Sequence, residues 1–257
     1  MRELKAVLLA CVAGTSLLYA QTQTSSGWDT YGGDAQGRRY SPLTQINTKN
    51  VARLKLAWQY GVATTNAVGR SQAVPILVRG RLYTSTARRT IVALDPATGA
   101  EIWKHELEKG AAPNRGVSYW PGDRGLPPRI LAGTTDGRLI ALDAATGTPV
   151  PTFGDRGAID LRAGVADKFP TLPYMMASPG LIYRNLIVTG AQGQEDNSEG
   201  PAMDVRAWDV RTGKLVWTFH TIPHPGEPGS DTWPKDYWMT AGTPANWASA
   251  RLTPRAV

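Results

Sequence analysis

The sequence predicts an all-β fold, a β-propeller assembled from repeated four-stranded sheets. The first observation is a pattern, Ala-x-Asp-x-x-Thr-Gly, that occurs three times, with its aspartate at Asp95, Asp143 and Asp209. The second is a short apolar run before each copy, followed by the start of another strand. The third is composition: 27 Gly and 19 Pro are spread along 257 residues, as expected for many short strands joined by turns. Repeats of this kind indicate a propeller.

Each repeat is predicted to be a β-hairpin. Residues 91–94 and 139–142 are short apolar strands. In the turn, Asp can accept a bond from the backbone two residues on, and Gly supplies a positive φ. Trp103 and Trp217 open the return strands and are expected to pack in the core or between blades. One such sheet cannot bury both faces, so the copies are expected to stack radially.

The spacing of the repeats sets the number of blades. Further strands are predicted before each hairpin, in residues 80–84, 129–133 and 180–189. Asp95 and Asp143 are 48 residues apart, and Asp143 and Asp209 are 66 apart. A blade takes about 40–50 residues, so three to four blades of a propeller are expected. The last residues, 251–257, lack a closing strand, so we expect a truncation or a frameshift, and a pseudogene product or truncated gene is one hypothesis.

The N-terminal 20 residues are predicted to be a signal peptide. Arg2 and Lys5 precede an apolar run over residues 6–20, which is shorter than the ~20 residues a membrane-spanning helix needs. Cleavage after Ala20 would leave residues 21–257 as a periplasmic propeller domain with no stable membrane span, and an association with the inner membrane stays open. Cys11, the single cysteine, lies in the signal, so no disulfide framework is expected.

Other function classes are disfavoured by composition and spacing. The net charge is +7, but the basic residues are scattered and form no nucleic-acid signature. His220 and His224 are four residues apart, a zinc-ligand spacing only on a helix, and Pro223 and Pro225 forbid a helix there. No glycine-rich dinucleotide or phosphate loop occurs, which disfavours NAD or ATP.

Four motifs in order carry a family resemblance. They are residues 28–34 (WDTYGGD) with 39–47, residues 51–58 (VARLKLAW), residues 114–123 (NRGVSYWPGD) and residues 204–223 (DVRAWDVRTGKLVWTFHTIP). Together they resemble the PQQ-dependent (quinoprotein) dehydrogenases, eight-bladed propellers that hold pyrroloquinoline quinone (PQQ) and Ca²⁺ in an axial funnel. The second motif, residues 51–58, resembles the first blade of this family.

The resemblance implies roles for particular residues. Arg115 would bind a PQQ carboxylate, because guanidinium matches carboxylate bidentately. Trp247 would lie under the planar cofactor, and Ser178 would reach it. The loop at 194–199 would ligate Ca²⁺, which prefers oxygen ligands. Asp196 and Asn197 are the first choice and Glu195 and Glu199 stay open. The alternatives are a solvated acidic loop and a surface Arg115 paired with Asp123.

The resemblance also implies an activity. No cysteine occurs in residues 108–113, which favours the glucose/polyol branch over the methanol or ethanol branch. The reaction would oxidise a sugar or alcohol hydroxyl and pass electrons to ubiquinone or a cytochrome c. No catalytic residue can be assigned, because the family's base comes later, so the chain alone is expected to be inactive. A second hypothesis is a non-catalytic propeller scaffold of the outer-membrane protein assembly type, without PQQ affinity.

Overall fold

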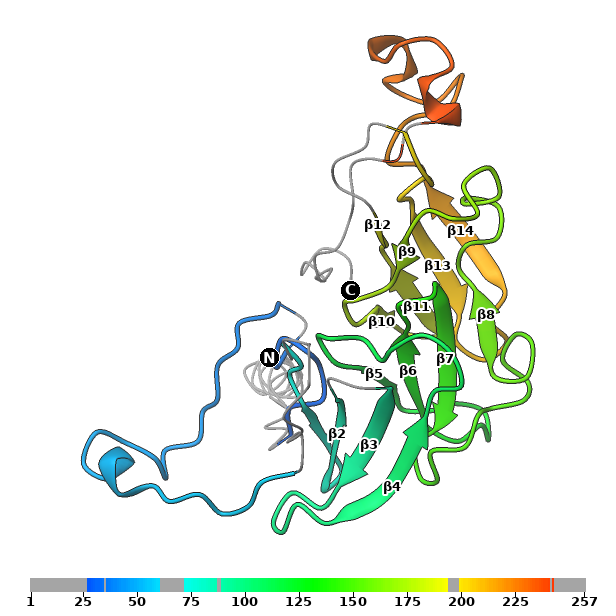
Figure 1. Ribbon diagram of the computed structural model, residues 1–257. Coiled ribbons are helices and arrows are strands. Elements are labelled where there is room, and N and C mark those ends of the chain that lie inside the picture. Colours follow the sequence, from blue (N-terminus) through cyan, green and yellow to red (C-terminus); the bar gives the residue numbers. More distant parts are fainter. Residues whose placement is uncertain are drawn as a thin grey trace, which may run out of the picture.

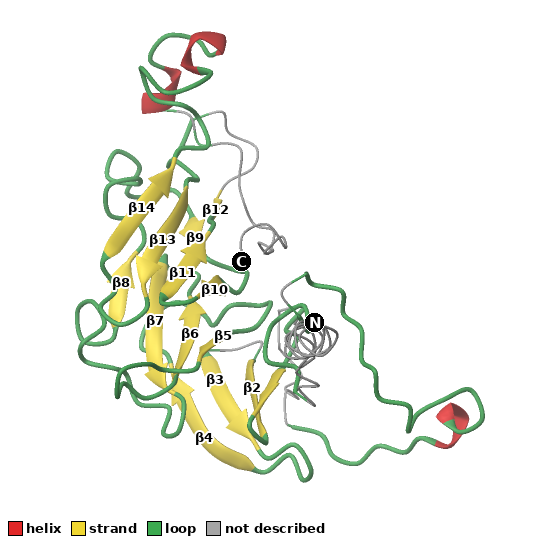
Figure 2. Cartoon of the chain, turned by 180° about the vertical axis from the view of Figure 1, so that it is seen from behind, coloured by secondary structure: helices red, strands yellow, loops and turns green. Residues whose placement is uncertain are grey.

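The computed structural model of the chain describes residues 27–34, 36–60, 72–86, 89–193, 199–240 and 242. These residues form β-strands joined by turns, together with three short 3-10 helices: η1 (Val51–Arg53), η2 (Ser230–Thr232) and η3 (Tyr237–Met239). Figure 2 shows that these helical turns lie outside the sheets. The predicted signal peptide lies outside the described residues, among which no helix is long and apolar enough to cross a membrane.

Three antiparallel sheets of four strands form the body of the chain. The first sheet contains β1 (Ile76–Val78), β2 (Arg81–Ser85), β3 (Thr90–Leu94) and β4 (Glu101–Glu106). The second contains β5 (Ser118–Trp120), β6 (Arg129–Gly133), β7 (Arg138–Asp143) and β8 (Ala158–Asp160). The third contains β10 (Leu181–Tyr183), β11 (Leu186–Thr189), β13 (Val205–Asp209) and β14 (Leu215–Phe219). A two-stranded ribbon of β9 (Tyr174–Met175) and β12 (Gln192–Gly193) extends beside them.

The sheets are arranged as sectors of a propeller. In Figure 1 they fan out from a concave side, where β5 and β10 lie, to an outer side, where β4 and β14 lie. The all-β propeller prediction is confirmed, and the described residues contain three complete blades.

One local prediction was wrong. Residues 180–189 were expected to form one strand, but they form the hairpin of β10 and β11, because Arg184 turns the chain with a φ of 53°. Residues 51–58 resemble the family's first blade in sequence, and the described structure does not test that resemblance. They form η1 and then run to Trp58 without joining a strand of the described sheets.

The three Thr-Gly turns adopt one structure, as predicted. Asp95 Oδ1 accepts hydrogen bonds from the Thr98 amide at 2.8 Å and from the Thr98 hydroxyl at 2.8 Å. Asp143 and Asp209 bind their own turns in the same way. Gly99 closes the first turn at a φ of 72°, a conformation that L side chains rarely adopt.

The core lies between the sheets. One apolar cluster joins the first and second sheets, and another joins the second and third. The first cluster includes Tyr83, Ile91, Trp103, Ile130 and Leu142, and the second includes Trp120, Leu131, Phe153, Ile187 and Trp208. The radial stacking inferred from the repeat is therefore what buries the apolar strands.

A buried arginine also ties the second sheet to the third. Arg129 on β6 is 1% exposed and donates to the carbonyl oxygens of Val210 at 2.7 Å and Arg211 at 2.8 Å. Its guanidinium lies 5.5 Å from the centroid of the Trp120 ring. Such charge-assisted bonds across a buried interface fix the relative position of the two blades. They thereby also fix the segments that lead into these blades.

Candidate cofactor site

Each sheet is entered by an irregular segment just before its innermost strand. Gln72 lies before β1, Arg115 before β5 and Ser178 before β10. The first two segments run side by side, because the Gln72 amide donates to the Asn114 carbonyl at 2.9 Å and the Val74 amide donates to the Arg115 carbonyl at 3.3 Å. The stacking of the blades thus collects their entry segments at one place.

Arg115 joins these three segments through its side chain. Its Nη1 donates to Ser178 Oγ at 3.0 Å, and its Nε donates to Gln72 Oε1 at 3.3 Å. The Arg115 side chain is half-buried. A guanidinium held by hydrogen bonds from two sides is oriented, and a partly buried cation attracts an anionic group.

The local sequence explains why the segments approach so closely. Gly116 has a φ of 112°, and a Cβ atom there would lie 2.9 Å from the Val74 carbonyl oxygen. Only glycine fits this position without displacing the neighbouring segment. On the other side, Ser118 Oγ donates to the Gly180 carbonyl at 2.6 Å and holds the start of β5 against the segment that carries Ser178.

The structure therefore brings two of the predicted cofactor residues, Arg115 and Ser178, into contact. Gln72, which contacts the same guanidinium, was missed by the sequence analysis. The available signal was its position, since Gln72 is a polar residue just before the apolar run of β1, as Arg115 is before β5. Asp123 accepts a hydrogen bond from Asn185 Nδ2 at 2.7 Å and lies 3.8 Å from Arg211 Nη1.

The predicted metal loop is only partly described. Glu199 is exposed, while Glu195, Asp196 and Asn197 lie outside the described residues, as does Trp247. Among the residues that the structure describes, no group of three or more His, Cys, Asp or Glu side chains could hold a metal ion.

The two histidines named in the sequence analysis lie on a loop after β14. Their rings stack with centroids 3.6 Å apart and planes 12° apart. In this arrangement the nitrogen lone pairs of His220 and His224 lie in parallel planes, so they do not converge on one ion. His220 Nδ1 lies 2.8 Å from Glu227 Oε1, which gives that ring a carboxylate partner instead.

Comparison with known proteins decides the family. The profile described as "PQQ: Glucose/ethanol/alcohol dehydrogenase, beta-propeller domain" matches residues 28–253. The chain belongs to this PQQ-dependent dehydrogenase family. The match covers the whole of the described structure apart from Gly27.

Curated relatives agree on the family. The large subunit of glycerol dehydrogenase from Gluconobacter oxydans (strain 621H) is 32% identical over 241 residues, covering 88% of this chain and 32% of the relative. Quinoprotein glucose dehydrogenase from Escherichia coli (strain K12) is 32% identical over 87% of this chain and 30% of the relative. The chain thus spans about a third of the length of these relatives.

Solved structures support the PQQ-dehydrogenase fold directly. The quinohemoprotein alcohol dehydrogenase ADHIIG from Pseudomonas putida HK5 aligns with a TM-score of 0.71 and 29% identity, over 89% of this chain and 33% of that one. A europium-containing methanol dehydrogenase aligns with a TM-score of 0.68 and 26% identity, over 89% of this chain and 41% of that one. The comparisons do not favour the scaffold alternative.

The residues around Arg115 fit the group for which the family is named. PQQ carries carboxylates, and the site offers a guanidinium, the carboxamide of Gln72 and the hydroxyl of Ser178. These groups can donate hydrogen bonds to carboxylate oxygens. The chemistry of the site is therefore that of a carboxylate-binding cradle.

Proposed function

We propose that the chain supplies the Arg115 side of a PQQ site in an oxidoreductase that oxidises a hydroxyl group of a sugar or an alcohol. The observation that carries the proposal is the convergence of Gln72, Arg115 and Ser178 from the entry segments of three consecutive blades. A site at the inner ends of several blades can enclose a ligand of PQQ's size, whereas a single blade cannot.

The residues of this chain would bind and orient the cofactor. The Arg115 guanidinium would hold a carboxylate by two parallel hydrogen bonds. Ser178 and Gln72 would fix the plane of the guanidinium, since each already contacts it at 3.0 and 3.3 Å. Such pre-organisation lowers the entropy cost of binding. PQQ, when bound, supplies the redox chemistry by accepting two electrons from the hydroxyl-bearing carbon.

We propose Ca²⁺ as the second cofactor. Asp196 and Asn197 are the preferred ligands, and Glu195 and Glu199 are the other candidates, because Ca²⁺ binds carboxylate and amide oxygens. Trp247 would stack under the planar quinone. No residue of this chain is assigned as the catalytic base, so cofactor binding is the appropriate measurement.

The finer assignments remain proposals as well. We favour a glucose- or polyol-type substrate, because residues 108–113 hold no cysteine. Ubiquinone or a cytochrome c would accept the electrons. Removal of residues 1–20 would release the protein into the periplasm, and N-terminal sequencing of the periplasmic protein checks this. A first residue other than Gln21 would contradict the cleavage site.

The test measures PQQ binding by the full chain in the presence of Ca²⁺. Quenching of tryptophan fluorescence and equilibrium dialysis both report the amount of PQQ bound. We expect Arg115→Gln to weaken binding about tenfold or more, because it removes a charge-assisted hydrogen bond. Ser178→Ala should weaken binding about threefold, because it only loosens the guanidinium. Arg156→Gln is the matched control, since the Arg156 side chain is 89% exposed and pairs only with Asp155 among the described residues.

Equal losses in the Arg115 and Arg156 variants would refute the assignment of Arg115, because the effect would then follow net charge alone. Absence of saturable PQQ binding by the unaltered chain would overturn the cofactor proposal and favour the scaffold alternative, while leaving the propeller fold intact.

A further inference from the structure

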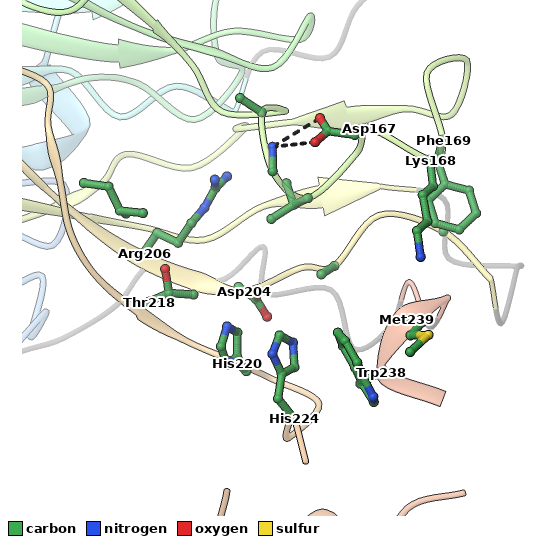
Figure 3. Close-up of a pocket in the computed structure, with 16 residues that line it drawn as sticks. Asp167, Lys168, Phe169, Asp204, Arg206, Thr218, His220, His224, Trp238 and Met239 are labelled. Carbon is green, nitrogen blue, oxygen red and sulfur yellow. Dashed lines mark hydrogen bonds between the residues drawn. The ribbon is translucent and has the colours of Figure 1, made fainter. Parts of the chain in front are cut away.

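A cavity of about 320 Å³ lies between the third sheet and the segment 163–169, and it shares no residue with the Arg115 cradle. Figure 3 shows its main side chains: Arg206 and Thr218 from the sheet, His224 and Trp238 from the segment after β14, and Lys168 from the opposite side. The volume is at the lower end of the range for small-molecule pockets.

One wall of the cavity is aromatic and firmly held. The His224 ring stacks on the His220 ring on one side. On its other side lies the Trp238 ring, with the two ring centroids 4.4 Å apart and the two planes at 46°. Glu227 fixes the wall, because it accepts a hydrogen bond from the His224 amide at 2.7 Å and lies 2.8 Å from His220 Nδ1. The His224 amide and the His220 side chain hold the pKa of Glu227 below its ordinary value, so Glu227 stays ionised at neutral pH.

The polar lining is balanced in charge. Asp204 and Arg206 are 5% and 3% exposed. Asp167 and Lys168 contribute exposed side chains from the segment on the other side, where Asp167 accepts from the Gly164 amide. Two carboxylates in the lining are thus matched by two cations, and the two histidine rings have the carboxylate of Glu227 beside them. Arg206 Nη2 donates to Tyr174 Oη at 2.7 Å and to the Leu161 carbonyl, while Arg206 Nε is buried and has no hydrogen-bond partner among the described residues. Thr218 adds a hydroxyl group to the lining.

We propose that this cavity binds a neutral, polyhydroxylated small molecule of monosaccharide size. Carboxylate, hydroxyl and guanidinium groups in one lining suit a ligand whose hydroxyls both donate and accept hydrogen bonds. The indole and imidazole faces suit its apolar CH surface. A charged ligand would add a charge that this lining does not compensate, which is costly in a partly buried site. The proposal does not depend on PQQ binding.

The experiment titrates the full chain, without PQQ, with D-glucose and sorbitol and follows binding by saturation-transfer NMR. D-gluconate and D-glucosamine are the anionic and cationic probes, and we expect each to bind at least about fivefold more weakly than glucose. Trp238→Leu should weaken glucose binding about tenfold by removing the aromatic face, and Thr218→Val about threefold by removing a hydrogen bond.

Trp233→Leu is the matched control, since Trp233 is on the same segment, stacks on Tyr237 and does not line the cavity. It should leave glucose binding unchanged. Arg115→Gln should also leave it unchanged while it impairs PQQ binding, which separates this proposal from the proposed function. The proposal is overturned by equal effects of Trp233→Leu and Trp238→Leu, by equal binding of the charged probes, or by no saturation below about 100 mM glucose.

Discussion

Trp103 and Trp217 hold the same place in the repeated hairpin, at the start of the return strand after the Thr-Gly turn, but their surroundings differ. Trp103 is 8% exposed, and its Nε1 donates to the Ala144 carbonyl of the second sheet at 3.1 Å. Trp217 is 40% exposed. Trp103 was expected to pack in the core or between blades, and it packs between the first and second sheets. The same expectation for Trp217 was wrong within the part of the chain that the structure describes.

The difference teaches where the stability of a blade originates. Trp58 contacts the first Thr-Gly turn as Trp103 contacts the second, because Trp58 Nε1 donates to the Pro96 carbonyl at 3.0 Å. Trp58 covers Gly99 of the first turn, and Trp103 covers Gly147 of the second. In both cases the tryptophan comes from the part of the chain that precedes the turn. The hairpin alone does not bury its tryptophan. The neighbouring blade does, as expected when stability comes from interfaces between repeats.

The largest expected effect is the contrast between Trp103→Ala and Trp217→Ala. We expect the first to lower the free energy of unfolding by about 3–5 kcal/mol, because it removes a buried aromatic side chain and leaves a cavity. The second should cost less than about 1 kcal/mol, as is usual for a partly exposed position. Urea denaturation of the full chain measures both, and equal losses would refute the idea that blade contacts rather than hairpins carry the stability.

A smaller effect tests the same contact from the Thr-Gly turn on which Trp103 packs. Gly147 and Gly80 have nearly the same φ, 73° and 74°, but a Cβ on Gly147 would lie 2.5 Å from the Trp103 ring, whereas nothing lies within 4 Å at Gly80. Gly80→Ala should cost about 1 kcal/mol from backbone strain alone. Gly147→Ala should cost about 1–3 kcal/mol more, because Trp103 must move. If thermal unfolding shifts equally in both variants, the docking of Trp103 on this turn contributes nothing.

Local features of the fold were predictable because they depend on neighbouring residues. The Thr-Gly turns need only Asp, Thr and Gly at fixed spacing, and the structure has them as predicted. The hairpin at Arg184 was missed because arginine has no strong turn preference. The exposure of Trp217 was missed because periodicity shows which side chains are apolar, not which face meets another sheet.

The candidate site was predictable only in part, for a similar reason. Arg115 and Ser178 were named through a family resemblance, but they are 63 residues apart, and Gln72 is 43 residues from Arg115. Their contact arises only after three sheets have stacked, so no local pattern signals it. An uncharged glutamine also has no conspicuous chemistry in a sequence. The contact among these residues is now visible, while their role in binding PQQ stays a proposal.

The smallest expected effect compares the turns of the first and third sheets. Hydrogen bonds from the Thr98 hydroxyl and amide hold the pKa of Asp95 below its ordinary value. For Asp209, burial alone would raise the pKa, but hydrogen bonds from the Arg211 side chain and amide outweigh it, so the pKa is again lowered. Both carboxylates are thus stabilised in their ionised form, by a hydroxyl in one turn and by a guanidinium in the other.

Because the folded-state pKa of Asp209 is depressed, its contribution to stability is complete above the unfolded value of about 3.9 and is lost as the pH falls through the folded value. Arg211→Gln should raise the pKa of Asp209 and remove a small part of that contribution, since solvent screens the pair. The Arg211→Gln variant should therefore be less stable than the unaltered chain at pH 7. The difference between their free energies of unfolding should narrow in strong acid.

Thr98→Val should raise the pKa of Asp95 with little change in stability. NMR titration of the two carboxyl carbons, with urea denaturation at neutral and acid pH, measures both. A difference in stability that is the same at acid and neutral pH would show that Arg211 acts through packing rather than through the charge of Asp209.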